Sequence, residues 1–140
     1  MLDALPADLR ARVIARGGAP GDVLFGPFRA ARPTGQGVPV GELPSAAQQA
    51  LKALVRSWIK NGPPSFAERR LALLEGPSFG SLRFVWLGSL EAGRPHAYRI
   101  EGPTMILEYV NRGDHVHTVW RSPPNDFGAA SLAQASASMR

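Results

Sequence analysis

Hydrophobic residues follow two different spacings along this chain, and the change of spacing separates a helical part from a sheet-forming part. In the helical part, a stripe with the spacing i, i+3, i+4, i+7 and i+8 is formed by Leu51, Leu54, Val55, Trp58 and Ile59. This spacing places the side chains on one face of an amphipathic helix. It predicts a helix over residues 45–61, with a capping box of Ser45 and Gln48 and with Gly62 after its end.

Two further helices are predicted around this one. Ser65 and Glu68 form a second capping box, and Gly76-Pro77 ends the helix that follows it. The two consecutive helices form an αα-hairpin, which we expect to cover one face of a sheet. A shorter helix is predicted over residues 2–16, because Leu5, Leu9 and Val13 recur at helical spacing.

From residue 81 onward, hydrophobic and polar residues alternate as they do in strands. Strands are predicted over residues 81–88, 96–101, 104–110 and 115–121. The expected fold class is α+β: a mostly antiparallel sheet of about four strands, packed by the αα-hairpin, with a long Pro/Gly-rich loop over residues 19–44. We expect one α+β domain over residues 1–128 and a disordered tail over residues 129–140.

The last two strands form a hairpin around Asn111-Arg112-Gly113-Asp114. A four-residue loop at this position predicts that Val110 pairs with His115 and that Glu108 pairs with His117. Side chains alternate between faces along a strand, so both histidines and Glu108 are expected on one face. A register shift by one residue would send Glu108 to the opposite face.

Two imidazoles and one carboxylate on one sheet face are a ligand set for a divalent metal, here Zn, Fe, Mn or Cu. We therefore expect His115, His117 and Glu108 as metal ligands. Near them, Tyr98 is a candidate proton donor, and Arg121 is a candidate to receive a substrate carboxylate or phosphate. Asp126 is a further ligand or a base, or else it caps a turn with Asn125. The alternative for Glu108 and His117 is an ordinary cross-strand ion pair.

Composition and charge exclude several classes of protein. Cysteine is absent, which rules out disulfides and thiol chemistry. The N-terminus has early acidic residues and no continuous apolar stretch, and no apolar run approaches the length of a membrane span. We therefore expect a cytoplasmic protein without a membrane partner. The net charge is +5, but the arginines are scattered and do not alternate with aromatic residues, so nucleic acid is not an expected partner.

A resemblance to a known family rests on residues 98–128. The segments E-G-P-T-M-I-L-E-Y-V-N, H-V-H-T-V-W-R and N-D-F-G follow one another in this order. They resemble the end of a bacterial and fungal family known as domain of unknown function 3500. The resemblance includes Glu108, His115 and His117, and it supplies no agreed activity. Members are commonly about twice this length, so the resemblance implies the C-terminal half. An acidic residue often follows W-R in the family, whereas Ser122 stands here.

Three functional hypotheses follow. The first is a metal-dependent enzyme with a small-molecule substrate, whose metal activates a bound water or another small ligand. The second is metal-free chemistry in which Glu108 orients His117 as a general base. The third is a non-catalytic binding module, which includes self-association as a homo-oligomer.

Overall fold

The structure, a computed structural model, describes residues 2–24 and 30–138. The two helices between residues 45 and 75 precede the four strands between residues 83 and 121, as the spacing of hydrophobic residues predicts, and the fold is α+β. In chain order the elements are η1 (Leu2–Ala4), α1 (Ala7–Val13), β1 (Val38–Pro39), η2 (Val40–Glu42), α2 (Ser45–Lys60), α3 (Pro64–Glu75), α4 (Ser78–Ser81), β2 (Arg83–Gly88), β3 (His96–Glu101), β4 (Ile106–Asn111), β5 (Val116–Arg121), η3 (Pro123–Gly128) and α5 (Ala129–Ser138).

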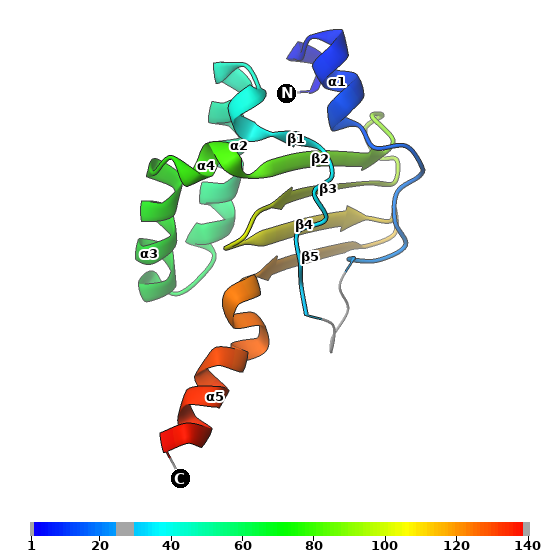
Figure 1. Ribbon diagram of the computed structural model, residues 1–140. Helices are drawn as coiled ribbons and strands as arrows, with labels where there is room; N and C mark the ends of the chain where they lie inside the picture. The colour runs from blue at the N-terminus through cyan, green and yellow to red at the C-terminus, as the bar shows by residue number, and fades with distance from the viewer. Residues whose placement is uncertain (1, 25–29, 139–140) are drawn as a thin grey trace.

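Within the described residues, the sheet has five strands in the order β1-β2-β3-β4-β5, and all neighbours are antiparallel (Figure 1). The sequence predicted about four strands, and the additional one is β1, in which Val38 pairs with Phe84 and Pro39 pairs with Arg83. A strand of two residues is too short to show alternation, and proline is confined to sheet edges. This edge strand therefore gave no readable signal in the sequence.

Helix α2 packs on one face of the sheet through the predicted stripe. Its buried residues are Ala47, Leu51, Val55 and Ile59. They join one hydrophobic core with the strand residues Phe84, Ile100 and Leu107. Leu54 and Trp58, also members of the stripe, are partly buried against this core. Leu107 of β4 belongs to the same core, and Trp120 of β5 packs against it.

The capping boxes predicted for the two helices are wrong. Helix α2 follows Pro44 directly and α3 follows Pro63 directly, and neither helix has a side-chain cap. Proline fixes φ near its helical value, so a proline before or within the first turn starts a helix without a hydroxyl cap. The Gln48 side chain instead donates a hydrogen bond to the backbone oxygen of Leu43 at 2.7 Å.

The opposite face of the sheet is covered by the connection between α1 and β1. Its described parts are residues 19–24 and 30–37, which we call the strap. The second part crosses β5, β4, β3 and β2 before it reaches β1 (Figure 1). Ala31 and Thr34 donate hydrogen bonds to η3 and β3, and Gln36 accepts one from β3, so the strap is fixed to both elements. The strap thus partly covers the sheet face that carries the candidate metal ligands.

The β4–β5 hairpin has a register two residues away from the predicted one. Val110 lies opposite His117, and Glu108 lies opposite Val119. The predicted pairing is wrong because the turn begins after Asn111 rather than at it: the Asn111 side chain accepts a hydrogen bond from Gly113 N–H at 2.7 Å, and Asn111 itself pairs with Val116. A shift of two residues preserves faces, so Glu108 and His117 share a face but lie diagonally.

Beyond the sheet, residues 129–138, where a disordered tail was expected, form α5, which continues from η3 and leads away from the sheet (Figure 1). In the part of the chain that the structure describes, no helix combines the length and the apolar character that a membrane crossing requires.

Candidate functional site

The two candidate histidines lie side by side at the end of the β4–β5 hairpin. Their ring centroids are 4.7 Å apart, at an angle of 49°. His117 Nδ1 lies 2.6 Å from Asp22 Oδ1 of the strap, and His115 Nδ1 lies 2.9 Å from Asp114 Oδ1. The hydrogen bond with His117 lowers the pKa of Asp22, so this carboxylate stays charged. Each histidine therefore already has an acidic neighbour, and neither neighbour is Glu108.

Glu108, the third candidate ligand, is buried and faces other partners. Its Oε1 accepts a hydrogen bond from the Leu24 backbone N–H at 3.1 Å and lies 3.6 Å from Arg99 Nη1. No group of three or more His, Asp or Glu side chains among residues 2–24 and 30–138 is placed to hold a metal ion. The structure thus brings the two histidines together and directs Glu108 toward an arginine.

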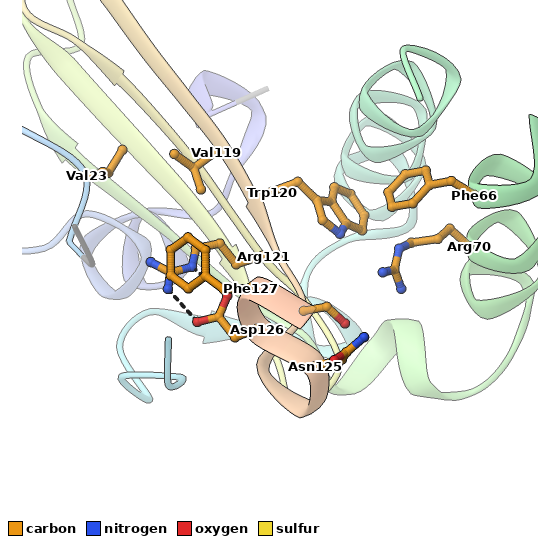
Figure 2. A pocket seen from close by; sticks show the side chains of 10 residues that line it. Val23, Phe66, Arg70, Val119, Trp120, Arg121, Asn125, Asp126 and Phe127 are labelled. Atoms are coloured by element: carbon orange, nitrogen blue, oxygen red, sulfur yellow. Dashed lines mark hydrogen bonds and ion pairs between the residues drawn. The ribbon is translucent and has the colours of Figure 1, made fainter. Parts of the chain in front are cut away.

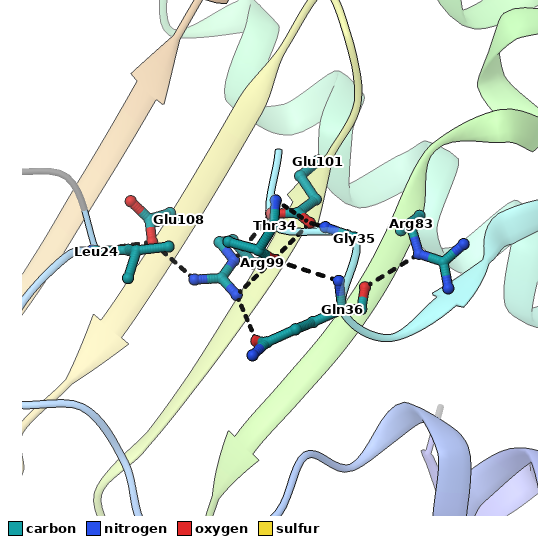
Figure 3. A network of polar contacts seen from close by, with 8 residues as sticks. All are labelled: Leu24, Thr34, Gly35, Gln36, Arg83, Arg99, Glu101 and Glu108. Carbon is teal, nitrogen blue, oxygen red and sulfur yellow. Dashed lines mark hydrogen bonds and ion pairs between the residues drawn. The ribbon is translucent and has the colours of Figure 1, made fainter. Parts of the chain in front are cut away.

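Arg99 is the centre of a buried polar network that the sequence analysis missed (Figure 3). It is only 5% exposed, and it lies between Glu101, whose Oε2 is 3.1 Å from Arg99 Nε, and Glu108. Its Nη2 donates to Gln36 Oε1 at 2.8 Å and to Thr34 Oγ1 at 3.2 Å. Glu101 is fully buried, and its other oxygen accepts three hydrogen bonds from Thr34 and Gly35. These contacts bind the strap to the sheet.

The network contains more acid than base. Two buried carboxylates share one buried guanidinium, and Glu108 Oε2 has no hydrogen-bond partner among residues 2–24 and 30–138. Figure 3 shows this second oxygen pointing away from Arg99. A buried acceptor without a partner is rare in proteins and costs free energy, all the more when it is ionised. A hydrogen-bond donor from outside the chain, placed beside Glu108 Oε2, would therefore remove this cost.

A cavity of about 420 Å³, which we call the strap cavity, lies beside this network, between the strap and β3–β4. Asp22, Leu24 and Gln36 line it from the strap, and Arg99 and Glu108 line it from the sheet. Among the described residues that line it, the acidic side chains are Asp22 and Glu108, and the basic one is Arg99. The cavity thus has apolar walls, an excess of negative charge and an acceptor without a partner.

The Tyr98 side chain lies on the other face of the sheet from the Glu108 side chain. Its ring stacks on Tyr109 at 5.0 Å, and its hydroxyl accepts a hydrogen bond from Trp58 Nε1 at 3.2 Å. Burial raises the pKa of Tyr98, and the hydrogen bond from Trp58 offsets part of that rise. Alternation along β3 puts Tyr98 and Arg99 on opposite faces, so Tyr98 faces α2 while the buried network faces the strap.

Arg121 and Asp126 form a pair with each other. Arg121 Nε donates to Asp126 Oδ1 at 2.9 Å, Arg121 Nη2 bonds to the second oxygen, and that oxygen also accepts the Ala31 backbone N–H at 2.8 Å. The guanidinium lies over the Phe127 ring, 4.5 Å from its centroid. The hydrogen bonds from Arg121 lower the pKa of Asp126. This pair therefore connects β5, η3 and the strap.

Arg99, Glu101, Asp22 and Thr34 were not singled out from the sequence. The signal for the first two was present in part, because charged residues at alternate positions of β3 share a face with Glu108 across the next strand. Such a pattern is typical of a solvent-exposed face, and only the covering strap turns it into a buried network. Asp22 and Thr34 lie in the Pro/Gly-rich loop. Its hydrophobic residues have no regular spacing, so the sequence does not predict where these two side chains lie in the fold.

The comparisons with known proteins give a family and no further relatives. A family model described as "Protein of unknown function (DUF3500)" matches residues 1–129. The match thus extends well beyond the segment at residues 98–128 on which the resemblance rested. A search of curated proteins and a search of solved structures each found no match.

Proposed function

The chain belongs to the DUF3500 family of proteins of unknown function, and we propose from its own geometry that it is a non-catalytic binding module for a small organic cation. The observation that carries this proposal is Glu108, which is 3% exposed, lines the strap cavity and has an Oε2 atom without a hydrogen-bond partner in the described part of the chain. An ammonium or guanidinium group would donate to this oxygen and balance the second buried carboxylate.

The composition of the cavity supports a ligand with an apolar body. Leu87, Ala97 and Val110 line it beside the polar network. Ligand sites are commonly apolar with a few fixed polar groups that set orientation. Here Glu108 would fix the cationic end, because Arg99 and the Leu24 N–H already hold its Oε1 in place. Preorganisation of this kind lowers the entropy that binding costs.

Binding of matched fragments tests the proposal. Butylammonium, butanol and butyrate have similar apolar bodies and differ in charge. We expect butylammonium to shift the NMR signals of the Leu24 amide and the Arg99 side chain saturably, and the other two fragments to leave them unchanged. Glu108→Gln should abolish the response. Glu91→Gln, at an exposed turn, changes the net charge equally and should retain it. Equal shifts by butyrate, or binding that survives Glu108→Gln, would contradict the proposal.

A second candidate function is the metal-dependent enzyme, favoured by the 4.7 Å separation of the His115 and His117 rings. His115, His117 and Glu108 would be the ligands, with Tyr98, Arg121 and Asp126 in supporting roles. Glu108 would have to leave Arg99 to reach the metal, and Asp22 is the carboxylate nearer to His117.

Metal analysis of protein purified without a histidine tag tests this second candidate. Stoichiometric Zn, Fe, Mn or Cu that is lost in the His115→Ala, His117→Ala double variant supports a metal site. Metal-free protein whose melting temperature is unchanged by these ions counts against it.

A further inference from the structure

A second cavity, of about 450 Å³, lies around the edge strand β5 and is separate from the strap cavity's carboxylate (Figure 2). On the helix side it is lined by Phe66 and Arg70 of α3 and by Trp120 of β5. Asn125, Asp126 and Phe127 of η3 line it at the end of the strand. We call this cavity the edge groove.

Two hydrogen-bond donors in the edge groove lack acceptors. Arg70 Nε and Trp120 Nε1 are both buried atoms without a hydrogen-bond partner among the residues that the structure describes. Figure 2 shows the guanidinium of Arg70 and the indole nitrogen of Trp120 pointing into the same space between α3 and β5. Buried donors are nearly always satisfied in native proteins, so two of them beside one groove indicate a place for an acceptor.

Aromatic rings hold the donors in position. Phe66 packs edge-on against Trp120, with ring centroids 5.8 Å apart and an interplanar angle of 78°. The guanidinium of Arg70 lies 4.7 Å from the Phe66 ring centroid and 5.5 Å from that of Trp120. A guanidinium stacked on rings has its N–H edge free for an in-plane partner.

The charge of the groove is also complementary to an anion. Among its described lining residues the charged groups are Arg70, Arg121 and Asp126. Asp126 is neutralised by its bidentate pair with Arg121, and no carboxylate in the described part of the chain forms an ion pair with Arg70. Arg69 lies beside Arg70 and adds positive charge. Burial lowers the pKa of Arg70, so an anion nearby would stabilise its charged form.

We propose that the edge groove binds a small monocarboxylic acid with an apolar body, whose carboxylate accepts from Arg70 Nε and Trp120 Nε1. The apolar body packs against the rings of Phe66 and Trp120, on the side of β5 where both donors lie. The acid end lies on the Arg70 side, away from the carboxylate of Asp126. This site does not depend on the strap cavity, and it takes the opposite charge.

The tryptophan indole signals provide a test with internal controls. Trp58 Nε1 donates to Tyr98, and Trp86 Nε1 donates to the Ser89 backbone oxygen, so only Trp120 is expected to gain a bond. In a titration with 3-phenylpropionate, we expect the Trp120 indole proton to move downfield saturably while the other two stay in place. The neutral 3-phenylpropanol should produce no comparable shift.

Variants make the assignment specific. Arg70→Gln should weaken 3-phenylpropionate binding about tenfold or more, because a charge-assisted bond is lost. Arg70→Lys keeps the charge without Nε and should be intermediate.

Trp120→Phe keeps a ring, removes the N–H, and should weaken binding about fivefold, read from the Arg70 Nε signal. Arg16→Gln, an exposed charge elsewhere, should change affinity less than about twofold. An unmoved Trp120 signal, an equal shift by 3-phenylpropanol, or full affinity in Arg70→Gln would overturn the proposal.

Discussion

Thr34 donates two hydrogen bonds to a single oxygen of Glu101, one from its backbone N–H at 2.8 Å and one from its hydroxyl at 2.7 Å. Gly35 N–H adds a third bond to the same oxygen at 2.8 Å. Because Glu101 is fully buried in β3, these bonds replace water completely for that oxygen and hold the strap over the sheet.

Loss of the Thr34 hydroxyl should therefore destabilise the protein. Thr34→Val keeps the shape of the side chain and leaves a buried carboxylate oxygen with one donor fewer. We expect the free energy of unfolding in urea to fall by about 1–3 kcal/mol. Ser57→Ala is the control, since the Ser57 hydroxyl bonds to the Leu54 backbone oxygen of its own helix on an exposed surface, and it should cost less than about 0.5 kcal/mol. A Thr34→Val protein as stable as the wild type would show that the strap is not fixed by this bond.

Arg99 and Glu108 should respond very differently to neutralisation. Arg99→Met leaves Glu101 and Glu108 buried without their cation, and we expect a loss of about 3–5 kcal/mol in stability. Glu108→Gln keeps an acceptor for the Leu24 N–H and leaves Arg99 paired with Glu101, so we expect a change within about 1 kcal/mol. Urea unfolding of both variants measures the contrast, and the reverse order would refute the described pairing.

The Arg121–Asp126 pair predicts a loss of stability in acid. Arg121 holds the pKa of Asp126 below its ordinary value of 3.8 in the folded protein. The stabilisation is thus fully present above the ordinary value and is lost as the pH falls through the lower, folded-state pKa. Asp126→Asn should lower stability at neutral pH by about 3 kcal/mol, because Arg121 then stays buried without its anion. The variant should also lose stability less steeply between about pH 5 and about pH 2.

The control for this pH profile is Asp3→Asn, because the Asp3–Arg10 pair is exposed. Surface pairs contribute little, so its profile should follow that of the wild type. The pKa values of three other carboxylates, Asp22, Glu75 and Asp114, are also lowered. Their contribution to the loss of stability in acid should be the same in both variants. A profile of Asp126→Asn that coincides with the wild type would contradict a role for this pair.

Gly37, where the strap meets the sheet, should not tolerate a side chain. It has a φ of +78°, and a Cβ added there would lie 2.1 Å from the Phe84 backbone oxygen. Gly93 has a nearly equal φ of +79° but open space around it. We expect Gly93→Ala to cost about 1–2 kcal/mol from backbone strain alone. Gly37→Ala should cost about 3 kcal/mol or more, since the clash adds to that strain. Thermal unfolding of the two variants separates backbone strain from the steric clash. An equal loss of stability in both would contradict the close approach of Gly37 to the Phe84 backbone.

The helices and four of the strands could be predicted because their hydrophobic residues repeat at the period of the element. The stripe of Leu51, Val55 and Ile59 gave α2 within one residue of its end, and alternation gave β3 with its exact bounds. Prolines determine edge strand β1 and the first residues of α2 and α3. The spacing of hydrophobic residues does not predict these effects of proline.

The candidate site was harder to predict because it depends on contacts between distant segments. Loop length alone gave a register two residues away for Glu108 and His117, since the side chain of Asn111 shifts the turn. Arg99 and Glu101 alternate on a strand as solvent-facing residues do, and their burial comes from the strap. Trp120 and Arg70 look like core and surface residues in the sequence, and only their juxtaposition beside Phe66 shows donors without acceptors.

The strap also has a consequence for the order of folding. Strands β2 to β5 form a meander in which each strand pairs with the next along the chain, so these pairings close short loops. The strap's bonds to Arg99 and Asp126 join residues separated by 63 and 95 positions. Closing long loops costs more entropy, and contacts of this kind slow folding. The meander and its helices are thus expected to assemble first, and docking of the strap to be the late kinetic step that completes the native state.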